Sequence, residues 1–231
     1  EDGIRDHCVT GSSDVCSSDL VDEALQRGLV VRAIVRPNSV LPKRLAEAEQ
    51  QGCLEVFRLD LNTAEALQHA LSGCSALVIA TGARPSVNLA GPMLVDAFGV
   101  RSQLKACGAV GLTRVVLVSS LCAGRWRHPL NLFGLILVWK RLGERWLEQS
   151  GLDWTVVRPG GLSEDDSRTG QEGVVFSGAD QQQSSSIPRR LVAQVCLDAL
   201  QEPGACGRII EITSSAQQPQ RRLAEWLLES A

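Results

Sequence analysis

Short, almost wholly apolar runs alternate with amphipathic stretches along most of this chain, and this alternation constrains its fold more than any other feature. The runs 75–80 and 114–118 are apolar at nearly every position, so both faces of an extended strand are expected to be buried. Strands buried on both faces belong to parallel sheets that helices cover on both sides. We therefore predict an α/β fold with a Rossmann-like, doubly wound parallel sheet in a single domain.

The same alternation places the individual elements. We expect strands at 29–35, 54–59, 75–80, 114–118, 154–158 and 208–212. Helices are expected from 63 onward and at 45–51, 92–109, 131–149, 190–200 and 220–228, with 21–27 as the end of an earlier helix. The segment 163–187 is polar and rich in Gly, Gln and Ser, which predicts a mobile surface loop.

Residues 1–20 have the character of foreign sequence. Residues 1–6 translate GAA GAC GGC ATA CGA GAT, and residues 12–20 translate AGT TCA GAC GTG TGC TCT TCC GAT CT. Both stretches match pieces of a standard indexed DNA-sequencing adapter, in the correct order; a natural polar N-terminus is the alternative. We interpret 1–20 as a non-native leader and 21–231 as the native domain. The leader then replaces the first strand and the Gly-rich loop of the sheet.

Net charge, the longest apolar run and the spacing of the cysteines limit what this protein can bind. The 231 residues carry a formal net charge of −3, which gives no general attraction to nucleic acid or acidic membranes. The apolar run 130–139 is too short to span a bilayer. Beyond Cys8 and Cys16 in the leader, no cysteine forms a CxxC pair or has a histidine at metal-ligand spacing. This pattern predicts no metal site, reduced thiols and a cytoplasmic location, or the plastid stroma if a transit peptide preceded the chain.

Three of the expected strands end at residues suited to a nucleotide. Ligands of doubly wound sheets bind beyond the carboxyl ends of the strands, where Arg36, Asp60 and Thr81-Gly82 stand. A basic residue at 36 suits the 2′-phosphate of NADP, while the alternative is a solvated arginine before a proline turn. Asp60 either accepts from the adenine amino group or caps the next helix, for which Asn62 is better placed. Thr81-Gly82 either lets the backbone pass close to a ribose or forms an ordinary turn.

The expected phosphate-binding loop is mostly missing. A GxxGxxG loop after the first strand lets the backbone approach a diphosphate at a helix N-terminus. The matching positions hold Gly11, Asp14 and Ser17. Gly11 matches, and we attribute that match to chance within the leader. The Asp14 carboxylate repels a diphosphate, so we expect this chain to bind a dinucleotide more weakly than the native gene product.

From Val21 onward, the chain resembles the atypical short-chain dehydrogenase/reductase family. Members include NmrA-like redox sensors, flavin/biliverdin reductase-like proteins and the NADP-binding module of a chloroplast import-associated protein. The resemblance implies a bare NADP(H)-binding domain of cyanobacterial or plastid type, a similarity that is most evident at 186–189. The motifs that carry the likeness are 30–36, Asp60-Leu61, Ala80-Thr81-Gly82, 116–120, Lys140 with Glu144, and 155–162.

The chain departs from the catalytic pattern of that superfamily. Dehydrogenases of this type place a serine after the fifth strand and a Tyr-x-x-x-Lys pair on the next helix, where the tyrosine transfers a proton. Ser119 and Lys140 match, but Ile136 stands four residues before Lys140, and the chain contains no tyrosine. Lys140 either binds the nicotinamide ribose or is a surface lysine paired with Glu144. Ser119 either faces the nicotinamide or caps its strand.

The turn after the sixth strand completes the candidate site. The resemblance implies that the backbone of Pro159 and Gly160 contacts the edge of the nicotinamide. The other interpretation is that these residues form a tight turn that the fold requires, and both interpretations can hold. Together with Leu61 and Ala80, these positions complete the expected contacts to NADP(H).

Two functions follow from these residues. The first is an NADP(H)-binding oxidoreductase without the catalytic tyrosine, which passes hydride to a small-molecule acceptor such as a flavin, quinone or tetrapyrrole. The alternative is a non-catalytic NADP(H)-sensing or scaffold module that regulates a protein partner. A sugar-nucleotide epimerase or dehydratase is disfavoured by the missing tyrosine and the short C-terminal part. No nucleic acid partner and no membrane span are expected.

Overall fold

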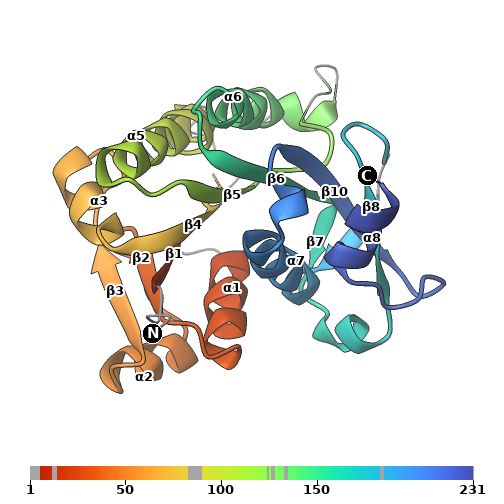
Figure 1. Cartoon of the computed structure of the whole chain (residues 1–231), viewed down its shortest axis with the longest axis horizontal. Helices are drawn as coiled ribbons and strands as arrows, with labels where there is room; N and C mark the ends of the chain where they lie inside the picture. Colours follow the sequence, from red (N-terminus) through yellow and green to blue (C-terminus); the bar gives the residue numbers. More distant parts are fainter. Residues whose placement is uncertain are drawn as a thin grey trace.

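The computed structural model describes residues 6–11, 15–82, 90–123, 125, 128–132, 135–182 and 185–230 (Figure 1). Its main sheet has the strand order β3-β2-β1-β4-β5-β6-β10-β8, and all neighbours pair in parallel except β8, which runs antiparallel to β10. The strands are β1 (Asp6–Gly11), β2 (Val31–Val35), β3 (Leu54–Arg58), β4 (Cys74–Ala80), β5 (Arg114–Val118), β6 (Asp153–Pro159), β8 (Gly173–Ser177) and β10 (Arg208–Ser215). This is the doubly wound order that the sequence predicts.

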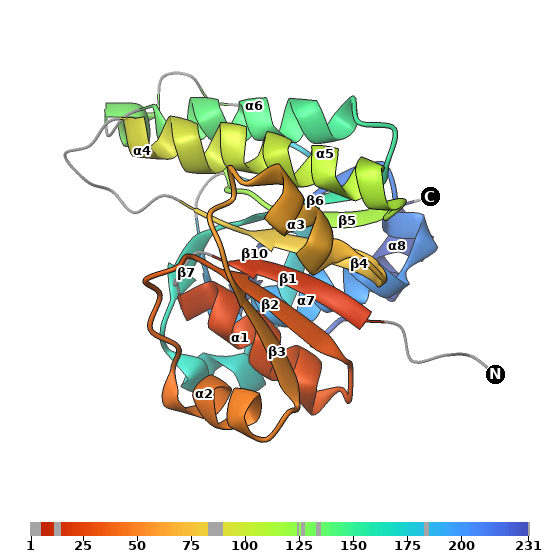
Figure 2. The ribbon, with the colours of Figure 1, turned by 90° about the vertical axis from the view of Figure 1, so that its left-hand side faces the viewer.

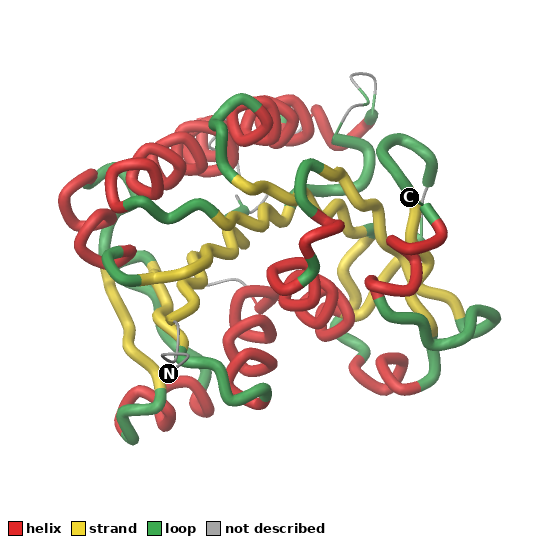
Figure 3. Tube along the Cα trace, viewed as in Figure 1, coloured by secondary structure: helices red, strands yellow, loops and turns green. Residues whose placement is uncertain are grey.

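Helices cover both faces of the sheet (Figures 2 and 3). One layer holds α1 (Val15–Gln26), α2 (Lys43–Gln50), α7 (Arg189–Gln201) and α8 (Leu223–Glu229). The other holds α3 (Ala64–Leu71), α4 (Ala90–Pro92), the π-helical segment η1 (Met93–Gly99), α5 (Val100–Val110) and α6 (Ile136–Glu148). Short 3₁₀ turns are η2 (Pro129–Leu132), η3 (Asp166–Gly170) and η4 (Pro203–Ala205), and a separate parallel pair joins β7 (Gly161–Ser163) to β9 (Ser186–Pro188).

Alternate residues of each central strand enter different cores. Along β4, Val78 packs with the α1/α7 layer, whereas its neighbours Leu77 and Ile79 pack with the α3/α5 layer. The side chains of all three are fully buried. Successive side chains of a strand point to opposite faces, so only a strand apolar at every position can serve two helix layers at once. This confirms the interpretation of the continuous apolar runs.

Strand β1 occupies the centre of the sheet although it lies within residues 1–20, the predicted leader. His7 is in register with Val31 of β2 and with Ala76 of β4, so β1 closes the gap between these strands. The helix expected to end at 27 is α1, which begins at Val15 and therefore also includes leader residues. Asp14 lies outside the described residues. The foreign origin of 1–20 stays a hypothesis, because backbone pairing depends little on side-chain identity.

The structure corrects two expectations about local structure. The interval 163–187 is not one continuous loop: it contains η3, β8 and β9. The helix expected at 131–149 is divided into η2 and α6, and α6 begins only at Ile136. Hydrophobic patterning could not separate these pieces, because apolar residues continue through the join.

The cysteines follow the expectation of free thiols with one exception. Cys53, Cys107, Cys122, Cys196 and Cys206 are free, and burial raises the pKa of the Cys107 thiol to about 12. Cys74 is disulfide-bonded, so the prediction of a reduced thiol is wrong there. No helix in the described part of the chain is both long and apolar enough to cross a bilayer.

Candidate functional site

The carboxyl ends of the parallel strands meet at one edge of the sheet, which is the side where α4 and β7 lie in Figure 2. Because all six strands β1 to β6 run in the same direction, every residue that follows one of them lies along this edge. The fold thereby brings together the residues that the sequence singled out: Gly11, Arg36, Asp60, Leu61, Ala80, Thr81, Gly82, Ser119, Pro159 and Gly160.

Arg36 and Asp60 line one cavity of about 410 Å³ beyond β2 and β3, together with Pro37, Asn38 and Ser39. The Ser39 N–H donates to the Arg36 carbonyl at 3.0 Å and closes a turn. The Ser39 hydroxyl is buried and has no hydrogen-bond partner among the described residues. A guanidinium, an amide and an unpaired hydroxyl around one cavity suit a phosphate group, whose oxygens only accept hydrogen bonds.

Asp60 anchors the turn after β3. Its Oδ1 accepts from the backbone N–H of Asn62 at 3.0 Å and from Asn62 Nδ2 at 2.9 Å. The expectation that Asn62 caps the next helix is therefore wrong: Thr63 is the residue before α3, and it makes no side-chain cap. Leu61 packs against the core of the α3/α5 layer, so its side chain has a structural role.

Two hydroxyls at the centre of the edge are buried without a hydrogen-bond partner in the part of the chain that the structure describes. Thr81 after β4 is 3% exposed and Ser119 after β5 is 7% exposed, and neither hydroxyl forms a hydrogen bond within the described residues. A buried polar group without a partner costs about 1–3 kcal/mol, and most such groups in native proteins are satisfied. Their position at the ligand-binding edge fits a bound molecule with hydrogen-bonding groups, such as a nucleotide cofactor.

Lys140 reaches this edge from α6. Its Nζ lies 2.9 Å from Asp96 Oδ1, and a Cβ on Gly82 would lie 3.8 Å from the same Nζ. The interpretation of Lys140 as a surface lysine paired with Glu144 is therefore wrong. The Asp96 side chain is 1% exposed and that of Lys140 is 16% exposed. The ammonium is held in place beside the end of β4.

The sequence did not predict Asp96 as a site residue, because an acidic residue within a helix normally faces solvent. It lies on the π-helical segment η1, which packs against α6. A Cβ on Gly143 of α6 would lie only 2.5 Å from the Asp96 carbonyl oxygen, so the two segments approach through a glycine. π-Helical turns are rare and frequently mark functional sites. The one available signal was the polar Asp96 within an otherwise apolar stretch, 92–100.

Glu144 instead forms a buried ion pair with Arg158 of β6. Arg158 Nε and Nη2 donate to its two oxygens at 2.9 and 2.8 Å, and both side chains are at most 1% exposed. Burial alone lowers the pKa of Arg158, but its hydrogen bonds and charge attraction to Glu144 raise it overall. Glu211, also within reach of Arg158, accepts from the backbone N–H groups of residues 180–182.

The turn at Pro159-Gly160 is tightly enclosed. The Gly160 N–H donates to the Ile212 carbonyl at 2.9 Å, and a Cβ at this position would overlap the Ser185 carbonyl oxygen. The Leu121 N–H donates to the Pro159 carbonyl at 2.8 Å, which ties the segment after Ser119 to this turn. Packing against Ser185 thus requires a glycine at position 160. This structural role is compatible with a contact between the backbone of the turn and a ligand.

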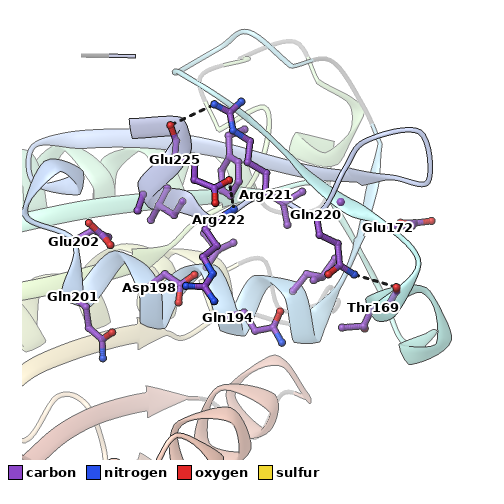
Figure 4. Close-up of a pocket in the computed structure, with 18 of the residues that line it drawn as sticks. Thr169, Glu172, Gln194, Asp198, Gln201, Glu202, Gln220, Arg221, Arg222 and Glu225 are labelled. Atoms are coloured by element: carbon purple, nitrogen blue, oxygen red, sulfur yellow. Dashed lines mark hydrogen bonds between the residues drawn. The ribbon is translucent and has the colours of Figure 1, made fainter. Parts of the chain in front are cut away.

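A larger cavity, of about 840 Å³, lies away from these residues (Figure 4). It separates α7, which contributes Gln194 and Asp198, from the segment 220–225. Two of its charged groups, Arg27 and Asp198, form an ion pair at 2.7 Å. Within the described residues, no group of His, Cys, Asp or Glu is arranged to hold a metal ion.

The chain belongs to the NAD(P)H-binding protein family, whose model matches residues 16–203. An uncharacterised chloroplastic protein of Arabidopsis thaliana is 34% identical over 224 residues, which cover 92% of this chain and 78% of that protein. The matched range contains strands β2 to β6 and the residues that follow each of them.

Solved structures agree on the fold. A putative NAD-dependent epimerase/dehydratase from Bacillus halodurans superposes with a TM-score of 0.79 at 24% identity, covering 97% of this chain and 99% of that one. A short-chain dehydrogenase/reductase from Veillonella parvula, in complex with NADP, gives 0.71 at 17% identity and covers 90% and 94% of the two chains. At these identities the likeness shows a shared Rossmann-like architecture.

Proposed function

We propose that this protein is an NADP(H)-dependent oxidoreductase of the atypical short-chain dehydrogenase/reductase type, which transfers hydride to a small-molecule acceptor without a catalytic tyrosine. The observation that carries this proposal is the pair of buried hydroxyls of Thr81 and Ser119, which have no hydrogen-bond partner in the described part of the chain, beside the Lys140–Asp96 ion pair. The proposal includes a cyanobacterial or plastid origin, which the chloroplastic relative supports.

The cavity beyond β2 and β3 supports a preference for NADP over NAD. Arg36 supplies positive charge there, and Ser39 supplies a hydroxyl without a partner among the described residues. A cofactor with a 2′-phosphate gains charge-assisted hydrogen bonds at this cavity, whereas NAD offers only a neutral ribose hydroxyl. In this assignment Asp60 receives the adenine amino group, and the backbone at Leu61 lies beside the base.

At the other end, Lys140 donates to the nicotinamide ribose hydroxyls. Asp96 fixes the direction of its ammonium, so little side-chain freedom is lost when the ribose binds. The hydroxyls of Thr81 and Ser119 supply further hydrogen bonds, and Ala80, Gly82, Pro159 and Gly160 contribute backbone. NADPH, when bound, supplies the hydride.

The missing tyrosine limits the acceptors. Ile136 occupies the first position of α6, one turn before Lys140, and it has no proton to give. An acceptor that takes its proton from solvent or from its own groups, such as a flavin, quinone or tetrapyrrole, avoids this requirement. The rate then comes mainly from holding the two partners at reacting distance.

The same absence favours a second candidate function. A module that binds NADP(H) and changes its affinity for a protein partner needs the cofactor site but no tyrosine. Such a module retains Arg36, Lys140 and Asp96 for cofactor binding and has no acceptor site.

Binding and turnover separate these candidates. Calorimetry with NADPH and NADH, on this chain and on a version with its genomic N-terminus restored, should show preference for NADPH and tighter binding by the restored protein. NADPH oxidation is then followed with flavin and quinone acceptors above the rate in free solution. Binding with no acceptor-dependent oxidation supports the sensing module, whereas no binding by either version overturns both candidates.

A further inference from the structure

Arg189, the first residue of α7, carries unsatisfied hydrogen-bonding groups that the cofactor assignment does not use. Its Nε and Nη1 atoms are buried, and neither has a hydrogen-bond partner among the described residues. Its side chain is 17% exposed, and the charge partner present is Glu164, whose Oε1 lies 3.0 Å from Nη1. The Glu164 side chain is itself 76% exposed. An ion pair with so exposed a partner stabilises little, so it is easily exchanged.

The fold places Arg189 beside two segments that the proposed function assigns to the cofactor. It directly follows β9, which pairs with β7 next to the Pro159-Gly160 turn, and the Ser185 carbonyl accepts from the Gly161 N–H at 2.9 Å. On its other side is α1, the helix whose N-terminus follows the expected phosphate loop. The positive charge of Arg189 acts on the carboxylate of Asp19 in α1. Both helices begin at the carboxyl edge of the sheet, and Figure 1 shows them side by side.

The chemistry of these free groups selects an anion. A guanidinium has only donors, arranged to meet the paired oxygens of a phosphate or carboxylate. Leaving its N–H groups buried without acceptors is unfavourable, so a ligand oxygen that replaces Glu164 satisfies them. The position at the start of a helix of 13 residues adds a favourable dipole for negative charge.

We propose that Arg189 binds an anionic oxygen group, a phosphate or a carboxylate, of a ligand lying across the carboxyl edge of the sheet. This inference rests on the proposed function for the identity of the ligand. The anion has two possible sources: the diphosphate of the cofactor, or an acidic group on the acceptor. In the second case Arg189 selects acidic acceptors over neutral ones.

Carboxylates near Arg189 compete with such a ligand. The Asp19 carboxylate of α1 feels the charge of Arg189 and also that of Asp22, Asp166 and Arg190, so negative charge gathers on this side of Arg189. Glu164 is the carboxylate in direct contact. Removing its charge while keeping its shape, with Glu164→Gln, should therefore strengthen anion binding several-fold.

The test uses the full chain with Arg189→Met, Arg189→Lys and Glu164→Gln. Arg190→Met is the matched control, because Arg190 adjoins Arg189 but donates to Gln26 and faces Glu23. Calorimetry with inorganic pyrophosphate measures anion binding independently of any activity. We expect Arg189→Met to weaken pyrophosphate binding about 10- to 100-fold, Arg189→Lys to weaken it less, and Arg190→Met to leave it nearly unchanged. Thermal melts verify that each variant folds.

Two further measurements identify the source of the anion. NADPH affinity reports on the diphosphate, and the ratio of turnover with FMN to turnover with riboflavin reports on an acidic acceptor, because these flavins differ only by a phosphate. If Arg189→Met loses affinity for NADPH, the anion that Arg189 binds is the diphosphate of the cofactor. If the variant loses the preference for FMN while its NADPH affinity is unchanged, the anion belongs to the acceptor.

Failure of this inference is distinguishable from failure of the proposed function. If folded Arg189→Met matches the parent in pyrophosphate binding, NADPH affinity and acceptor preference, the inference is overturned while the oxidoreductase proposal stands. If the parent neither binds NADPH nor reduces an acceptor, the oxidoreductase proposal falls, and the pyrophosphate comparison alone still decides the role of Arg189. Weaker pyrophosphate binding by Glu164→Gln than by the parent would also contradict the proposed role of Arg189.

Discussion

The two halves of the nucleotide edge are built in different ways. Beyond β2 and β3, the cavity lined by Arg36 and Asp60 is open, and its residues follow one another within short turns. Beyond β4 to β6, Thr81, Ser119 and Asp96 are buried and come from separate segments. The first half depends on local sequence, whereas the second depends on long-range packing. Substitutions should therefore affect affinity in the first half and stability as well as affinity in the second.

The largest effect is expected from Glu144→Gln in the buried half. The substitution leaves the Arg158 guanidinium, 1% exposed, without its bidentate carboxylate. Breaking a buried ion pair from one side destabilises by about 3–5 kcal/mol. Urea denaturation followed by circular dichroism measures this loss. Glu148→Gln is the control, because Glu148 is partly exposed and pairs with Arg141 at the surface, so a loss under about 1 kcal/mol is expected. Equal losses would contradict the prediction that the buried Glu144–Arg158 pair stabilises more than the surface pair.

Arg36→Ala should have the next largest effect, and it should appear in binding alone. The loss of a charged contact to a 2′-phosphate is expected to weaken NADPH binding by about 1.5–3 kcal/mol. NADH affinity and the free energy of unfolding should stay nearly the same, since Arg36 is exposed. Calorimetry with both nucleotides makes the comparison. An equal decrease for NADPH and NADH would remove the NADP assignment of this cavity.

Gly143→Ala tests whether the buried half needs close packing between α6 and η1. The added Cβ would lie 2.5 Å from the Asp96 carbonyl oxygen, so the segments must separate. We expect a destabilisation of about 1–3 kcal/mol, together with weaker NADPH binding as Lys140 is displaced. Gly108→Ala in α5 meets nothing within 4 Å and should stabilise by about 0.5–1 kcal/mol. If Gly143→Ala leaves the melting temperature unchanged, α6 can move away from η1 without loss of stability, and the buried half does not depend on this close contact.

The smallest effect concerns Asp19, beside Arg189. Burial and the nearby Asp166 raise its pKa from 3.8 to about 6. Since the folded pKa is the higher one, the stabilising contribution is complete below pH 3.8 and is lost as the pH rises through 6. Asp19 is partly exposed, so we expect Asp19→Asn to stabilise by only about 1 kcal/mol at pH 7.5 relative to its effect at pH 4. Melting curves across this pH range make the measurement. A pH-independent difference would rule out this titration.

The difference between the halves also explains what could be predicted from the sequence. Arg36, Asp60 and Ser119 were found because the end of an apolar strand is visible in the chain, and parallel strands share one carboxyl edge. Asp96 was missed because its pairing with Lys140 joins residues far apart in the sequence, across a glycine contact. The interval 163–187 was misjudged because β8 pairs with β10, and polar composition does not show such a distant partner.

The chain by itself determined the class of fold, since strands apolar on both faces leave few alternatives to a parallel sheet between two helix layers. It also showed that no tyrosine stands four residues before Lys140, where Ile136 is found. Only the tertiary structure decided the partners of the buried charges: Lys140 with Asp96, and Glu144 with Arg158. The physical reason is that helical spacing brings Lys140 and Glu144 near each other on the surface of one helix, but burial of a charge requires a partner. The elements packed against α6 supply those partners.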